Sequence, residues 1–145
     1  MTRHLEWQET YRIGFDRIDS DHQKLVGLTN DVFEAFEEGD IEAIRGHVFN
    51  GLMDYVEVHF AREEAAMAAS NYPYLEAHIQ RHQKMKEELL SFQKFFALIS
   101  TQEVEELFRS FLQNWLFDHI LKEDMGYRET MEAHRQVVEA ALERG

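Results

Sequence analysis

The sequence predicts an all-α protein: an antiparallel up-down four-helix bundle with an N-terminal arm and an extra C-terminal helix. Pro73 is the only proline, no segment sustains the alternation of apolar and polar residues typical of a strand, and apolar residues recur at spacings of three and four. Turn signals separate these helical stretches by only a few residues, and short connections favour antiparallel neighbours. We therefore expect four long helices packed side by side.

The chain is expected to begin with an arm that leads into the first helix. Residues 1–18 have the pattern of an extended arm with three aromatic side chains, and Ser20 and Gln23 have the spacing of a capping box, so the first helix is expected to start at Ser20. Gly39 suits the left-handed residue that ends a helix, and Asp40 is the expected N-cap of the second helix. The aromatic side chains of the arm are Trp7, Tyr11 and Phe15.

Two more bundle helices and a C-terminal helix follow. The segment Asn71-Tyr72-Pro73 is expected to end the second helix, and the apolar stripe over residues 75–96 marks the third. Ser100 and Glu103 form a second capping box, which is expected to begin the fourth helix. Residues 128–143 predict an amphipathic helix that docks outside the bundle.

Length, charge and composition restrict the possible functions. We expect a single domain, residues 1–145, in which residues 20–124 form the bundle. The formal net charge of -13 argues against nucleic-acid and membrane partners, because both attract Lys and Arg patches. The absence of cysteine excludes thiolate zinc sites, iron–sulfur clusters, c-type haem and disulfides. Without an apolar signal segment or a long apolar run, we expect a cytoplasmic protein, and we expect a monomer.

Six side chains with metal-binding chemistry continue the apolar stripes of the expected helices. Two pairs among them are four residues apart, a spacing that places both members on one helix face. Burying five imidazoles and a carboxylate is costly unless they are paired or bind metal, and this donor set suits iron, zinc or copper. Five histidines are too many for one tetrahedral zinc, whereas two metals bridged by carboxylates would use them all. The six residues are His22, His59, Glu63, His78, His82 and His119.

Each histidine alone is a weak signal, because a single buried histidine is usually a hydrogen-bonded structural residue. The metal interpretation depends on the whole set, which converges from all four helices at a consistent depth. His4, His47 and His134 lie off the apolar stripes. We interpret these three as solvated surface histidines.

The order and spacing of the six residues and their neighbours resemble the hemerythrins, and in particular their bacterial single-domain branch. The resemblance covers essentially the whole chain. A departure occurs at Asp21, where many relatives have glutamine. The matching segments are Ile18-Asp19-Ser20-Asp21-His22, His59-Phe60-x-x-Glu63-Glu64, Tyr72-Pro73, His78-x-x-x-His82, Trp115-Leu116-x-x-His119-Ile120 and Asp124.

The resemblance implies reversible dioxygen binding for oxygen storage, transport or delivery, by a binding protein rather than an enzyme. It implies two iron ions (Fe2+/Fe3+) joined by an oxo or hydroxo bridge. Counting ligands leaves one position open on the iron with two histidines, where a small molecule could bind end-on. The implied ligands are His78, His82 and His119 for one iron, His22 and His59 for the other, and Glu63 and Asp124 as bridges.

The surroundings of this centre can also be predicted. Tyr127 is expected to hydrogen-bond near the cluster. On an ideal helix, Glu123 would share the face of His119, whereas Asp124 would lie about 140° away; we nevertheless favour Asp124 as the bridge, because Gly126 indicates that the helix ends or unwinds nearby. The expected dry pocket over the open position, whose residues could equally be ordinary core, consists of Leu25, Phe60, Leu116 and Ile120.

Other functions are less compatible with the motifs. Oxygen or redox sensing, or nitric oxide binding, through the same di-iron site is the best alternative, since a separate partner could supply an output module. A ferritin-like di-iron oxidase is less favoured because its Glu-x-x-His motif does not occur. A zinc hydrolase would need His-Glu-x-x-His, which is also absent, and a b-type haem would use only two of the histidines.

Overall fold

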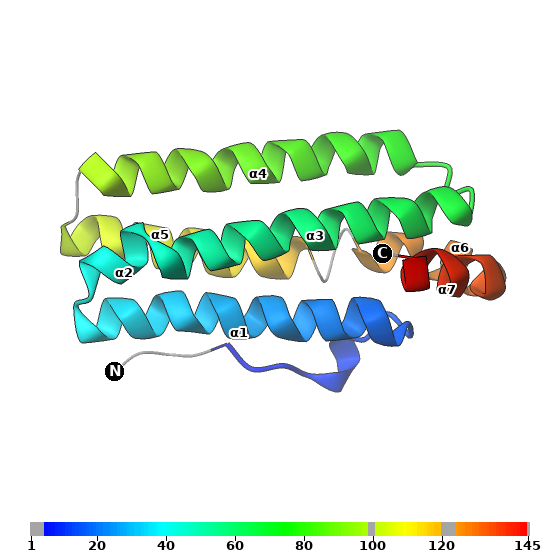
Figure 1. Ribbon diagram of the computed structural model, residues 1–145, viewed down its shortest axis with the longest axis horizontal. Coiled ribbons are helices and arrows are strands. Elements are labelled where there is room, and N and C mark those ends of the chain that lie inside the picture. The colour runs from blue at the N-terminus through cyan, green and yellow to red at the C-terminus, as the bar shows by residue number, and fades with distance from the viewer. Residues whose placement is uncertain (1–4, 99–100, 120–123, 145) are drawn as a thin grey trace.

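Four long helices lie side by side and alternate in direction in this computed structural model (Figure 1). The structure describes residues 5–98, 101–119 and 124–144, without the side chains of 97, 124, 125 and 144. In chain order, the first long helix contacts the second and the fourth, and the third also contacts the second and the fourth. The predicted all-α up-down bundle is therefore confirmed. The four helices are α1 (Asp16–Glu38), α3 (His47–Ala69), α4 (Leu75–Leu98) and α5 (Gln102–Phe117).

The first helix begins one turn earlier than the capping box predicts. Helix α1 starts at Asp16, and Phe15 at the N-cap position makes no side-chain cap. The carboxylate of Asp19 instead accepts hydrogen bonds from the backbone N–H groups of Ile13 at 2.7 Å and Gly14 at 3.2 Å. A first-turn carboxylate thus holds the end of the arm, and the expected start at Ser20 is wrong.

The turn between the first two bundle helices agrees with its sequence signals. Gly39 adopts the left-handed conformation, with φ 70°, and ends α1. The side chain of Asp40 then accepts a hydrogen bond from the N–H of Ala43 at 3.1 Å and caps α2 (Ile41–Arg45). The single expected second helix is divided at Gly46, whose φ of -114° and ψ of -116° separate α2 from α3.

The fourth long helix begins with a threonine cap. The hydroxyl of Thr101 caps α5 by accepting from the N–H of Val104 at 3.3 Å. Ser100, the expected cap, lies outside the described residues. The regular helix ends at Phe117, and a π-helical turn follows at residues 118–119. Residues 120–123, the stretch leading toward Gly126 where the helix was expected to end or unwind, lie outside the described residues.

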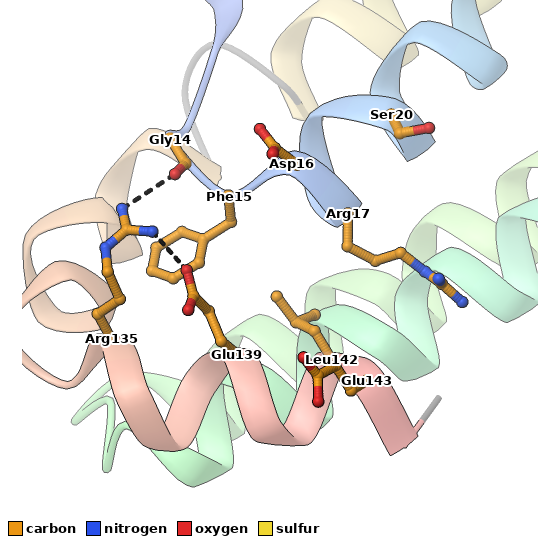
Figure 2. A pocket seen from close by; sticks show the side chains of 9 residues that line it. All are labelled: Gly14, Phe15, Asp16, Arg17, Ser20, Arg135, Glu139, Leu142 and Glu143. Carbon is orange, nitrogen blue, oxygen red and sulfur yellow. Dashed lines mark hydrogen bonds and ion pairs between the residues drawn. The ribbon is translucent and has the colours of Figure 1, made fainter.

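The C-terminal segment forms two short helices, α6 (Arg128–Ala133) and α7 (Arg135–Arg144), beside one end of the bundle (Figure 1). Arg135 at the start of α7 donates to the carbonyl of Gly14 at 3.0 Å and to Glu139 at 2.7 Å, and its guanidinium lies 4.3 Å from the ring centre of Phe15 (Figure 2). A cleft of about 450 Å³ lies between α7 and the start of α1. Helix α7 is thus attached to the arm as well as to α3.

Two hydrophobic clusters lie along the bundle, one on each side of the expected metal ligands. The larger cluster includes Leu25 of α1 and Met85 of α4, whereas the smaller includes Ile18 of α1 and is packed against by Leu75 of α4. His22 lies between the two α1 positions in sequence.

Among the described helices, none has both the length and the apolar character needed to cross a lipid bilayer.

Candidate metal centre

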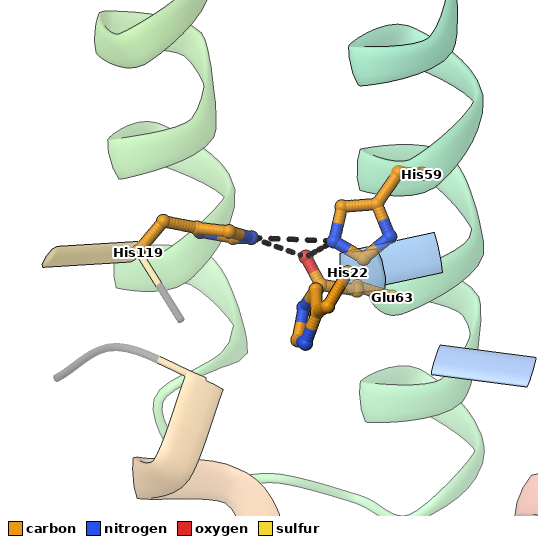
Figure 3. Close-up of side chains that lie close together, drawn as sticks. All are labelled: His22, His59, Glu63 and His119. Atoms are coloured by element: carbon orange, nitrogen blue, oxygen red, sulfur yellow. Dashed lines mark hydrogen bonds and ion pairs between the residues drawn. The ribbon is translucent and has the colours of Figure 1, made fainter. Parts of the chain in front are cut away.

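Six buried side chains converge from the four long helical segments. Helix α1 contributes one histidine, α3 a histidine and a glutamate, α4 two histidines, and the π-helical turn after α5 one histidine. Five of the six are fully buried, and His78 is 7% exposed. Figure 3 shows His22, His59 and His119 around the carboxylate of Glu63. These residues were all expected from the sequence: His22, His59, Glu63, His78, His82 and His119.

The potential ligand atoms form two groups that share Glu63 and His119. Within each group the atoms lie within 4.8 Å of one another. The carboxylate of Glu63 therefore lies within ligand distance of both groups. His119 belongs to both groups by distance, whereas the resemblance assigns it to one iron only. The groups are His22, His59, Glu63 and His119, and Glu63, His78, His82 and His119.

The distances around Glu63 show which nitrogen of four of the histidines faces the centre. Oε1 of Glu63 lies 3.1 Å from Nε2 of both His59 and His119 and 3.4 Å from Nε2 of His82. Oε2 lies 3.6 Å from Nε2 of His22. The Nε2 atoms of His59 and His119 are themselves only 3.3 Å apart. Imidazole nitrogens gathered around a carboxylate form a donor set that suits iron, zinc or copper.

Two of the histidines are oriented by carboxylates on their outer sides. Nδ1 of His59 lies 3.0 Å from Oδ2 of Asp21, and Nδ1 of His82 lies 2.8 Å from Oε2 of Glu64. A carboxylate accepts a hydrogen bond, so a histidine that binds a metal through Nε2 would keep its proton on the Nδ1 that faces the carboxylate. Among the described residues Nε2 of His82 has no hydrogen-bond partner, although it is buried. A role for His82 as a metal ligand through Nε2 would explain both the carboxylate at Nδ1 and the buried Nε2 without a partner.

The buried carboxylate of Asp21 is held by two further groups. Its Oδ1 accepts from the hydroxyl of Tyr55 at 2.6 Å and from the guanidinium of Arg62. Burial by itself raises the pKa of Asp21, but hydrogen bonds from His59 and Tyr55, with the attraction of His59 and the bond from Arg62, hold this pKa below its ordinary value. Burial and the same carboxylate raise the pKa of Tyr55. Asp21 is therefore an anion that accepts three hydrogen bonds.

Sequence reasoning did not identify Tyr55, Arg62 and Glu64 as parts of the site. Tyr55 precedes His59 by four residues and Arg62 follows it by three, so these side chains share one face of α3. That spacing is a usable signal only when Asp21 of α1 is known to lie opposite. Glu64 stands in the hemerythrin-like segment, but its partner His82 is on another helix.

Tyr127 lies against the centre from the C-terminal side. It is fully buried in the smaller hydrophobic cluster, and its hydroxyl donates to Oε2 of Glu63 at 2.6 Å. The centre of its ring lies 5.7 Å from the centre of the His78 ring. The segment after the fourth bundle helix thus contributes a donor to the shared carboxylate.

Three of the four residues expected to line the oxygen pocket are buried in the described part of the chain. Leu25, Phe60 and Leu116 all belong to the larger cluster, and Ile120 lies outside the described residues. The ring of Phe60 stacks on His82, with centres 3.8 Å apart and an interplanar angle of 1°. Phe60 therefore packs directly on one of the expected ligands.

The second expected bridge cannot be placed. The side chain of Asp124 and the whole of Glu123 lie outside the described part of the chain. Asp124 begins a 3-10 helix, η3 (Asp124–Tyr127), after the π-helical turn that holds His119. Of the histidines interpreted as surface residues, His47 and His134 are exposed, and His4 lies outside the described residues.

Comparisons with known proteins agree with this arrangement. A family model described as the hemerythrin HHE cation binding domain matches residues 13–140. Over 130 residues, covering 90% of this chain and 83% of the relative, the chain is 30% identical to a bacteriohemerythrin of Stenotrophomonas maltophilia. It is 31% identical to a bacteriohemerythrin of Pseudomonas aeruginosa over 86% of this chain and 79% of the relative. A bacteriohemerythrin of Clostridium acetobutylicum is 28% identical over 83% of this chain and 96% of that relative.

Proposed function

This chain belongs to the hemerythrin HHE cation binding domain family, and from this premise we propose that it binds dioxygen reversibly at a pair of non-haem irons. The physiological use would be storage, transport or delivery of oxygen. The observation that supports the proposal is the pair of four-residue ligand groups that share the buried carboxylate of Glu63.

The proposed ligand assignment follows the two groups. His22 and His59 hold one iron, and His78, His82 and His119 hold the other. Glu63 and Asp124 bridge the irons together with an oxo or hydroxo group. The location of Glu63 in both groups supports its bridging role. His119 is a member of both groups. Its assignment to the iron with His78 and His82 rests on the resemblance.

The two irons, when bound, supply the electrons that dioxygen takes up on binding and returns on release. The protein's own residues hold the ligands and keep the centre dry. Asp21 and Glu64 orient His59 and His82, and Tyr127 fixes Glu63. Fully buried apolar side chains such as Leu25 and Leu116 exclude bulk water from the bundle interior.

Metal analysis combined with an ultraviolet-visible spectrum before and after oxygen tests the proposal. We expect protein reconstituted with ferrous iron to hold two irons per chain and to develop an oxygen-dependent charge-transfer colour that disappears when oxygen is removed. Glu63→Gln should lose iron, whereas Glu57→Gln, on the exposed face of the same helix, should not. One metal per chain, or a preference for zinc, would contradict the proposal.

A further inference from the structure

Asp21 divides its two oxygens between different tasks. Oδ2 faces Nδ1 of His59 at 3.0 Å, whereas Oδ1 accepts from the hydroxyl of Tyr55 at 2.6 Å and from the guanidinium of Arg62. The side chain of Asp21 is 2% exposed and that of Arg62 is 9% exposed. Tyr55 and Arg62 therefore orient the carboxylate through Oδ1, and Oδ2 contacts the ring of His59.

We propose that Arg62 is a positioning residue for the metal centre: acting through Asp21, it holds His59 in the tautomer whose Nε2 lone pair faces Glu63. The inference rests on the proposed function, because the orientation of this lone pair matters only if His59 binds a metal.

Two carboxylates flank the ring of His59, whereas an imidazole that binds a metal carries a single N–H. Asp21 lies 3.0 Å from Nδ1, and Glu63 lies 3.1 Å from Nε2. If Glu63 receives the proton, Nε2 is blocked as a metal ligand. If Asp21 receives the hydrogen bond, the proton stays on Nδ1 and Nε2 is free to bind. The proton therefore stays on Nδ1 only while Asp21 remains oriented as a hydrogen-bond acceptor toward that nitrogen.

Arg62 holds Asp21 in this orientation. A buried carboxylate is costly unless it is paired with a cation and its lone pairs are satisfied. Arg62 supplies the cation, and Tyr55 adds a neutral donor to the same oxygen. Burial lowers the pKa of Arg62, but its hydrogen bond to Asp21 reverses that effect and raises the pKa above its ordinary value, so the guanidinium remains charged.

The arrangement follows from the register of two helices. Tyr55, His59 and Arg62 are spaced by four and three residues and lie on one face of α3. Asp21 of α1 meets this face, and the next residue along α1 is the ligand His22. A shift of either helix by one residue would separate Asp21 from all three partners.

Substitutions of Arg62 test the inference. Arg62→Met removes the charge but keeps an apolar stem, Arg62→Lys keeps the charge, and Lys84→Met removes a charge from the exposed face of α4 as a matched control. The first readout is the tautomer of His59 in the metal-free full-length chain near pH 8, from nitrogen-15 chemical shifts. The second is the affinity for ferrous ion, measured without oxygen.

We expect the unmodified protein and Lys84→Met to show the Nδ1–H tautomer of His59. Arg62→Met should show a mixture with the Nε2–H tautomer and a ferrous affinity lower by about 10–100-fold, the range found for residues that orient metal ligands. Arg62→Lys should restore most of both. If Arg62→Met does not fold, Tyr55→Phe, which removes only the neutral donor, should cause a smaller shift in the same direction.

The inference is overturned if Arg62→Met keeps the tautomer and the ferrous affinity of the unmodified protein. It is also overturned if Arg62→Lys and Arg62→Met lose affinity equally while the tautomer stays unchanged, because Arg62 would then act only by packing. Failure of the unmodified protein to bind iron would refute the proposed function instead, and the tautomer measurement would still decide whether Arg62 controls His59.

Discussion

Replacement of Tyr127 by phenylalanine removes one hydrogen bond from the shared carboxylate and little else. The hydroxyl of Tyr127 donates to Oε2 of Glu63 at 2.6 Å, and both side chains are fully buried. The ring would keep its contacts in the smaller hydrophobic cluster. Tyr127→Phe therefore isolates the contribution of the hydroxyl group.

The size of the effect follows from the charge and burial of the acceptor. A hydrogen bond to a charged group contributes about 1.5–3 kcal/mol. Glu63 keeps its other contacts, so we expect a loss of unfolding free energy toward the lower end of that range. For a chain of this size each kcal/mol lowers the thermal midpoint by about 2–4 °C, which predicts a decrease of about 3–6 °C.

Thermal unfolding of the iron-loaded protein, followed by circular dichroism, measures this loss. Tyr74→Phe is the matched control because Tyr74 is 66% exposed, and its midpoint should stay close to that of the unmodified protein. Iron release to a chelator should also be faster in Tyr127→Phe. If the two variants unfold at the same temperature and release iron at the same rate, the hydrogen bond to Glu63 does not stabilise the centre.

Four other outcomes can be measured. Asp124→Asn should lose iron or oxidise rapidly while Glu123→Gln stays near normal by metal analysis and oxygen binding; the opposite result would assign the bridge to Glu123. Leu116→Gln should shorten the lifetime of the oxygenated state, because it admits water or protons to the bundle interior, and an unchanged lifetime would remove Leu116 from the pocket. Acidification should release the metal as the histidines become protonated, and the metal-free protein should melt below the loaded form; equal midpoints would refute this coupling. Gly39→Ala should lower the unfolding free energy by about 1–2 kcal/mol, because Gly39 has a left-handed conformation. Gly27→Ala within α1 should raise the unfolding free energy by about 0.5–1 kcal/mol, because nothing lies within 4 Å of the added Cβ and alanine favours the helix. Denaturant titrations that give the same sign for both variants would contradict this dependence on backbone conformation.

Local signals predicted the helix boundaries that depend on one or two residues. The turn at Gly39 and Asp40 is correct because a left-handed glycine and a side-chain cap are both encoded in the residues themselves. The start of α1 was misplaced because Asp19 bonds the arm at Ile13 and Gly14, a contact that competes with the capping box at Ser20. Capping patterns recur along a chain, and the surrounding packing selects among them.

The sequence by itself determined which potential ligands share the buried face of each helix. A spacing of four residues sets the angle between two side chains on one helix, and the cost of burying imidazoles indicates a metal. The outer partners were decided only by the tertiary structure: His59 meets Asp21, His82 meets Glu64, and Tyr127 meets Glu63 across separations of 38, 18 and 64 residues. Helical spacing gives the direction of a side chain around its own axis, whereas its partner on another helix depends on the register and packing of the two helices.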